Sequence, residues 1–235
     1  MAMSPAKAHF QRATAALEAA ATAPDALMEG LTGYEVQLAK LQQDEQRLKQ
    51  VQSTEGKATL KIALLPEYVP YVEGVIASGQ GAQDDVIVTV MLWRFDAGDY
   101  VGGLEVADYV LKHGLKMTDR FKRTAGCVVA EEVAEVALNA MKAGTSFDMA
   151  ILTRTNELTA AQDMPDQVRA KLYLAMGRLT AAQVNEETPA EADKANLEAA
   201  KQYFSRAIEL HDKCGAKKDQ ERVDRLLKRH AGLAS

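Results

Sequence analysis

Two pairs of adjacent carboxylates are the residues whose types could perform catalysis: Asp84 with Asp85, and Glu131 with Glu132. Carboxylates hold the ions of two-metal nucleases, but such a site needs several acids that converge on one point. Neighbouring residues on a helix point about 100° apart, so one pair cannot supply that site. We therefore expect Asp84 and Asp85 to complement the positive end of a helix, and Glu131 and Glu132 to lie on a solvated face.

Other catalytic signatures are absent from the sequence. It contains no glycine-rich phosphate-binding loop, no His-Glu-x-x-His motif and no Gly-x-Ser-x-Gly motif. Cys127 and Cys214 do not form a Cys-x-x-Cys pair, which favours two reduced thiols in a cytosolic protein over a zinc site or a disulfide. The histidines are scattered along the chain: His9, His113, His211 and His230. We predict no catalytic residue, no metal and no cofactor in this chain.

Cationic residues gather in two clusters, which are more informative about binding. The first cluster lies in residues 112–123, where five cations outnumber a single acid, Asp119. Its cations are Lys112, Lys116, Arg120, Lys122 and Arg123. The formal charge of −5 argues against a uniformly basic nucleic-acid binder. A local cluster can still contact phosphates, because the local field governs binding.

The second cluster lies in residues 211–230, with seven cations against four acids. Four of these cations recur at spacings of 4, 3 and 4 and so form one helical stripe: Lys218, Arg222, Arg225 and Arg229. An apolar stripe about 120° away contains Val223, Leu226, Leu227 and His230. A helix held by its apolar side would present the arginines outward, where they can contact DNA phosphates. The alternative is an ordinary solvated surface helix.

The composition favours a helical protein. Hydrophobic residues make up 47% of the chain, mostly Ala, Leu and Val, while aromatic residues make up 6% and proline and glycine are scarce. No apolar run approaches the roughly 18 residues of a membrane span, and residues 1–10 lack the apolar core of a signal peptide.

The stretch from Gly81 to Leu115 is the densest apolar part of the chain and predicts a helical hairpin at the centre of the core. Its first helix contains an almost unbroken apolar run from Val86 to Trp93, the only tryptophan. A helix that is apolar on nearly all sides must be buried. The predicted second helix, Tyr100–His113, has a register typical of a tetratricopeptide repeat, and residues 195–210 repeat that pattern.

The N-terminal region predicts two helices. Ser4-Pro5 is typical of a helix start, and Phe10, Ala13 and Leu17 share one face of the helix that follows. Residues 34–52 form a longer, polar, heptad-like helix that is typical of a coiled coil. Its apolar positions are Leu38, Leu41 and Leu48. This narrow stripe suits either self-association between subunits or packing on the chain's own core.

The remaining segments complete an all-α fold. Within residues 53–80, Pro66 and Pro70 bracket a broken but apolar region, and one further helix is expected over residues 72–77. Periodic apolar positions predict helices over residues 128–143, 147–156, 167–180, 195–210 and 219–230. We expect a long coiled-coil-like helix followed by stacked helical hairpins, with an N-terminal oligomerisation region at residues 1–55 and a helical core domain at residues 56–235.

Five segments together resemble one known family. They are YEVQLAKLQQDEQRLK from Tyr34, Leu65–Pro70, the hairpin Gly81–Leu115, Glu131-Glu132-Val133, and Asp163–Leu172. In order and spacing they resemble the terminase endonuclease (small) subunit of peduovirus-type tailed phages, over about residues 34–220. The resemblance implies genome packaging in the host cytoplasm. It also implies binding to double-stranded phage DNA at the cohesive-end site, oligomerisation and recruitment of a large subunit that holds the ATPase motor.

Two departures from the family pattern qualify what the resemblance implies. Some members continue into a Lys/Pro-rich basic tail, whereas this chain stops at Ser235, so DNA contact is expected from the two cationic clusters instead. The family name also includes "endonuclease", although no nuclease signature is visible. Two other functions stay open at this point: a subunit with its own metal-dependent nuclease site, and a helical-repeat adaptor that binds protein without touching DNA.

Overall fold

The computed structural model describes residues 3–24, 26–118, 123–185 and 191–233. These residues form eleven α-helices and one short 3-10 helix. Their β-structure is one isolated bridge between Leu27 and Gln83. The expected all-α fold is therefore confirmed. Within the described residues, no helix is both long and apolar enough to span a membrane.

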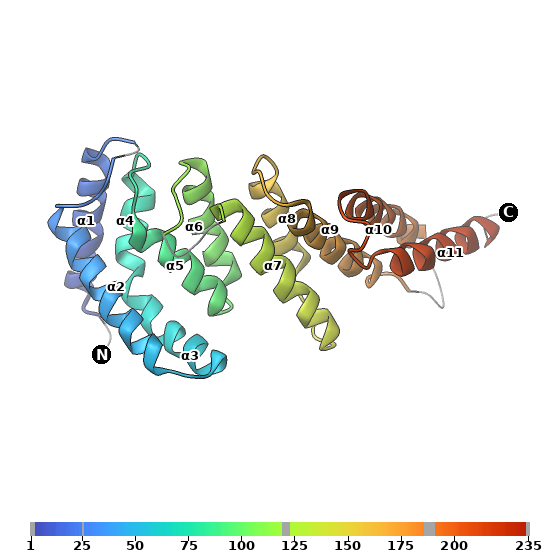
Figure 1. Ribbon diagram of the computed structural model, residues 1–235, viewed down its shortest axis with the longest axis horizontal. Helices are drawn as coiled ribbons and strands as arrows, with labels where there is room; N and C mark the ends of the chain where they lie inside the picture. Colours follow the sequence, from blue (N-terminus) through green and yellow to red (C-terminus); the bar gives the residue numbers. More distant parts are fainter. Residues whose placement is uncertain (1–2, 25, 119–122, 186–190, 234–235) are drawn as a thin grey trace. The chain divides into compact units, whose positions relative to one another are not determined.

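The chain divides into two compact units, Met1–Ala125 and Gly126–Ser235. The expected oligomerisation region at residues 1–55 and core domain at residues 56–235 stay predictions. The first two helices pack against later helices of the first unit, so residues 1–55 share a unit with the hairpin. The first unit contains α1 (Pro5–Ala21), α2 (Thr32–Gln50), α3 (Thr54–Leu64), the 3-10 helix η1 (Leu65–Glu67), α4 (Val69–Ser78), α5 (Asp85–Asp96) and α6 (Tyr100–Lys112) (Figure 1).

Helix α5 is the centre of the first unit, as its sequence predicted. Every residue from Val86 to Trp93 is buried, including the hydroxyl-bearing Thr89. Helix α6 folds back along it as an antiparallel partner after a turn at Gly98, whose φ of 80° favours glycine. The Trp93 ring meets the Tyr68 ring edge-on, with centroids 5.8 Å apart. The tetratricopeptide-like register of α6 stays a prediction.

Asp84 begins α5 as its N-cap. Its Oδ1 accepts hydrogen bonds from the backbone amides of Val86 (2.8 Å) and Ile87 (3.0 Å), and its Oδ2 accepts one from the Tyr71 hydroxyl (2.6 Å). The side chain is fully buried, and that burial raises the pKa of Asp84 to about 6 despite these hydrogen bonds. Asp84 thus has the helix-start role that its position predicted.

Helices α1 and α4 pack side by side through small residues (Figure 1). The buried residues of α1 are Ala15 and Ala19, while Phe10 and Leu17 on the expected apolar face are 72% and 74% exposed. A Cβ atom on Gly74 of α4 would lie 2.3 Å from the carbonyl oxygen of Arg12. The two helix backbones therefore approach too closely for a larger residue at Gly74.

Helix α2 packs on the chain's own core. Leu41 and Leu48 are 4% and 8% exposed, and Leu38 is half-buried. Asp44 is buried on the same face and accepts hydrogen bonds from Lys40 (2.7 Å), Arg47 (2.8 Å) and the Tyr68 hydroxyl (2.8 Å). Burial alone would raise the pKa of Asp44, but these hydrogen bonds outweigh it and lower that pKa. Packing on the core accounts for Leu41 and Leu48, and self-association through α2 stays a prediction.

The segment before α5 contains two helices joined by the short 3-10 helix η1. Residues 54–64 form α3, capped by the Ser53 hydroxyl, which accepts a hydrogen bond from the Gly56 amide at 3.0 Å. Pro66 and Pro70 lie in the first turns of η1 and α4, where a missing amide hydrogen breaks no helical bond. At the first of these prolines, the 3-10 helix η1 separates α3 from α4.

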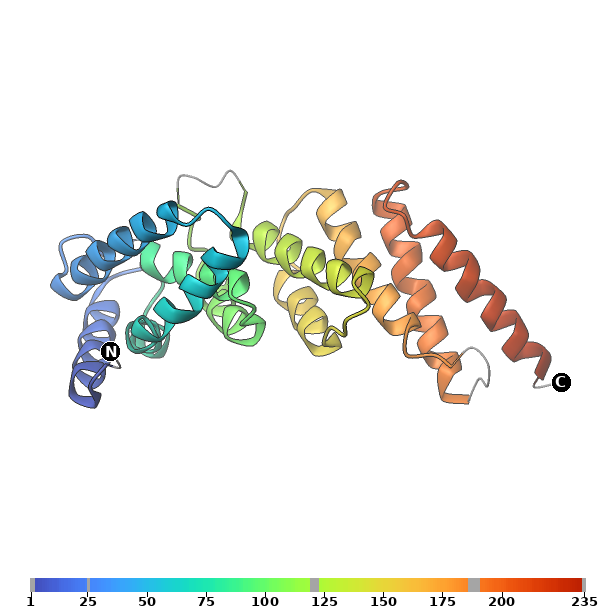
Figure 2. The same ribbon diagram turned by 90° about the horizontal axis from the view of Figure 1, so that it is seen from below.

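The second unit contains α7 (Ala125–Lys142), whose first residue lies at the division, followed by α8 (Met149–Thr159), α9 (Asp166–Ala181), α10 (Glu191–Leu210) and α11 (Lys217–Leu233). Helices α9, α10 and α11 pack in sequence, and α11 runs back along α10 after a tight turn (Figure 2). Helix α9 approaches α10 closely, since a Cβ on Gly177 would lie 2.6 Å from the ring of Phe204. Phe204 is fully buried at this contact.

Candidate nucleic-acid interface

Helix α11 has one buried face and one cationic face. Val223 and Leu226 are 1% and 6% exposed and hold the helix in the second unit. The side chains of Lys218, Arg222, Arg225 and Arg229, which we call the α11 stripe, are all exposed. The structure therefore places all four predicted cations of this cluster together on one solvent-facing side.

Two carboxylates of α11 point toward neighbouring helices. Asp219 accepts a hydrogen bond from Arg178 Nε of α9 at 2.8 Å, and Asp224 pairs with Lys201 of α10 at 2.7 Å. Helix α11 contains six cations and three acids, the third acid being Glu221. Because two of these acids bond to α9 and α10, the positive charge of the helix is concentrated toward its exposed face.

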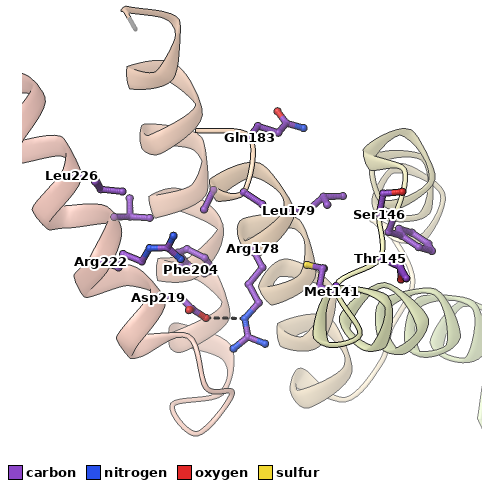
Figure 3. Close-up of a pocket in the computed structure, with 15 residues that line it drawn as sticks. Met141, Thr145, Ser146, Arg178, Leu179, Gln183, Phe204, Asp219, Arg222 and Leu226 are labelled. Atoms are coloured by element: carbon purple, nitrogen blue, oxygen red, sulfur yellow. Dashed lines mark hydrogen bonds and ion pairs between the residues drawn. The ribbon is translucent and has the colours of Figure 1, made fainter. Parts of the chain in front are cut away.

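A groove of about 670 Å³ runs beside α11 within the second unit (Figure 3). Its apolar surface includes Phe204 and Leu226, together with half-buried side chains from the end of α7 and from α9. Arg178, Asp219 and Arg222 supply its charges. We call this the α9–α11 groove and define it by Met141, Phe147, Arg178, Leu179, Phe204 and Arg222. Arg222 thus belongs to both the groove and the α11 stripe.

The first cationic cluster follows α6 in the first unit. Lys112 ends that helix, and Lys112, Lys116 and Arg123 are exposed. Arg120 and Lys122 lie outside the described residues. The backbone of Lys116 is fixed by Gln83, whose Oε1 accepts from the Lys116 amide at 2.8 Å and whose Nε2 donates to its carbonyl at 3.0 Å. The three described cations stay candidates for DNA contact.

The paired acids considered for a metal site make other interactions or face solvent. Asp84 caps α5, and Glu131 lies 3.9 Å from Lys171, which also pairs with Glu135 at 3.3 Å. Glu132 is exposed. Within the described ranges, no three His, Cys, Asp or Glu side chains are grouped closely enough to hold a metal ion. Cys127 and Cys214 are not joined in a disulfide.

The sequence did not indicate the α9–α11 groove. Arg178 and Asp219 are 41 residues apart, and no spacing rule connects them. The only sequence signal at Phe204 is the repeat-like spacing of residues 195–210. A groove between helices depends on how they cross, which periodicity along one helix does not report.

Comparison with known proteins gives a consistent result. Residues 38–167 match the family described as "Phage small terminase subunit". The chain is 44% identical over 225 residues to "Terminase, endonuclease subunit" of Escherichia phage P2, covering 96% of this chain and 86% of that protein. It is 25% identical over 160 residues to "Probable terminase, endonuclease subunit" of Haemophilus phage HP1 (strain HP1c1), covering 67% of this chain and 57% of that protein. No solved structure matches the chain. On the family match and the extent of its identity to the P2 protein, this chain belongs to the phage small terminase subunit family.

Proposed function

We propose that this protein recognises phage DNA for packaging by laying the α11 stripe along the phosphate backbone. Membership of the small terminase family supports a role in genome packaging. The observation that carries the DNA contact is the exposed row Lys218, Arg222, Arg225 and Arg229 on a helix fixed by buried Val223 and Leu226. Guanidinium groups on a rigid helix can bond phosphate oxygens without reading the base sequence.

The proposal also includes assembly. The protein would act as an oligomer in the host cytoplasm, bind the cohesive-end site and bring the large terminase subunit to it. Three exposed cations at and beyond the end of α6 would add a second set of phosphate contacts: Lys112, Lys116 and Arg123. Phosphate contacts repeated over several subunits would raise the affinity for one DNA site by avidity.

Cleavage is a separate matter, because the names of the two relatives include "endonuclease subunit". The described acids do not converge on one point, so we assign cleavage to the assembled complex and not to this chain alone. A nuclease built from this chain's own acids is the competing hypothesis. Cutting of cohesive-end DNA by the purified chain with Mg²⁺, in the absence of the large subunit, would support that competitor.

Replacing Arg222, Arg225 and Arg229 together by alanine is expected to weaken binding to double-stranded DNA by at least about tenfold at low salt. The slope of log affinity against log salt should also become shallower by about 3, since each lost phosphate contact removes about 0.9 from it. Fluorescence anisotropy with labelled duplex DNA at two or more salt concentrations measures both quantities.

A matched control removes three exposed cations of the same unit that lie outside the stripe: Arg154, Lys194 and Arg206. This control has the same net charge as the stripe variant and should bind DNA almost as well as the wild type. If both variants lose affinity equally, DNA binding depends on the total charge of the protein and not on the α11 stripe. If neither changes, α11 is not part of the DNA site.

A further inference from the structure

The α9–α11 groove has apolar walls that the proposed DNA contact does not use. Met141, Phe147 and Leu179 are only half-buried on its walls, and fully buried Phe204 forms part of its floor. Its volume of about 670 Å³ lies within the range of roughly 300–1,000 Å³ typical of ligand pockets. Apolar walls do not stabilise a bound phosphate backbone. They do stabilise the apolar side chains of a protein partner, which are removed from water there.

The charges around the groove indicate the chemistry of its occupant. Arg178 and Arg222 are the two cations among the lining residues, and Asp219 is the one acid. Asp219 already bonds to Arg178 at 2.8 Å, as Figure 3 shows, so the lining residues carry a net positive charge. An occupant that buries apolar side chains here is therefore favoured if it also brings a carboxylate. A second positively charged surface is disfavoured.

We propose that the α9–α11 groove receives a segment of the large terminase subunit that carries apolar side chains flanked by at least one carboxylate. The inference rests on the recruitment step of the proposed function and names the surface that performs it. Because Arg222 belongs to both the groove and the stripe, the occupied groove and the bound DNA lie on adjoining sides of α11.

Filling the groove tests its role. Ala182, an exposed residue at the end of α9, lines the groove, and A182W would occupy it without changing any charge. We expect A182W to weaken binding of the purified large subunit by about tenfold or more while leaving affinity for duplex DNA within about twofold. The matched control is A160W, at the exposed end of α8 and outside the groove, which should leave both affinities unchanged.

Reversing one charge tests the chemistry of the partner. Gln183 is exposed and lines the groove. If the docking segment is acidic, Q183E should weaken binding of the large subunit and Q183K should strengthen it, each by about two- to fivefold. Equal effects of the two substitutions, or effects of the opposite sign, would contradict the proposal that the docking segment is acidic.

The outcomes separate this inference from the proposed function. If the wild type binds the large subunit and A182W binds it equally well, the groove is not the docking site but recruitment stands. If the wild type does not bind the large subunit at all, recruitment and the inference fail together. If A182W instead lowers the mass of the protein in solution, the groove holds a second copy of this chain, which also overturns the inference.

Discussion

Replacing Gly74 by alanine is expected to destabilise the first unit by about 2–3 kcal/mol. The added Cβ would lie 2.3 Å from the Arg12 carbonyl oxygen and 2.9 Å from the Ala15 Cβ, and both atoms belong to α1. Inserting a methyl group into a packed contact costs about 1–3 kcal/mol, and more when backbone must move. In an open helix the same change would instead stabilise by up to about 1 kcal/mol, because alanine favours helix over glycine.

The sign of the effect therefore decides whether α1 and α4 pack as described. Trp93 is the only tryptophan and is buried in the first unit, so its fluorescence during urea denaturation reports the unfolding of that unit. The matched control is A77G, at an exposed position of α4 three residues away, which should cost only the helix propensity of about 1 kcal/mol. A stabilised G74A variant would contradict the close approach of the two helices.

Replacing Asp84 separates its hydrogen bonds from its charge. D84N keeps an acceptor for the amides of Val86 and Ile87 and a partner for the Tyr71 hydroxyl, whereas D84A removes all three interactions. Neither variant has a charged side chain at position 84. We expect D84A to be less stable than D84N by about 2–4 kcal/mol, the sum of a lost N-cap and an unpaired buried hydroxyl. Urea denaturation followed by Trp93 fluorescence measures the difference.

The charge of Asp84 adds a pH dependence that D84N lacks. Burial raises the pKa of Asp84 from 3.8 to about 6, so the folded chain binds this proton more tightly than the unfolded chain does. The stability of the wild type relative to D84N should therefore fall as pH rises from about 4 to about 6, and then level off. The total change should be about 3 kcal/mol. A stability difference that does not vary across this range would contradict the buried, ionising carboxyl group.

The sequence predicted those parts of the fold that depend on local pattern. The apolar run from Val86 to Trp93 identified a buried helix because it has no polar face that could be exposed to water. Ser4 was identified as an N-cap from its type and the proline that follows, and its hydroxyl accepts from the Lys7 amide at 3.3 Å. The separation of Val223 and Leu226 from the arginines of α11 likewise follows from helical spacing alone.

Other features depend on pairs of helices and could not be read from one segment. Phe10 and Leu17 are larger than Ala15 and Ala19, yet the alanines are buried, because α4 approaches α1 too closely for large side chains. The α9–α11 groove likewise depends on contacts between residues about 40 apart, such as Arg178 and Asp219. Of the candidate DNA site, the sequence indicated the cations but not the groove beside them.

The most direct test of the central claim, that this chain assembles on phage DNA as a small terminase subunit, is its mass in solution with and without cohesive-end DNA. One chain has a mass of 25.5 kDa. We expect a multiple of that mass for the protein alone, and a single larger species containing DNA when the duplex is added at low salt. The variant lacking Arg222, Arg225 and Arg229 should keep the protein mass but not form the larger species. A species of 25.5 kDa that DNA leaves unchanged would contradict the account.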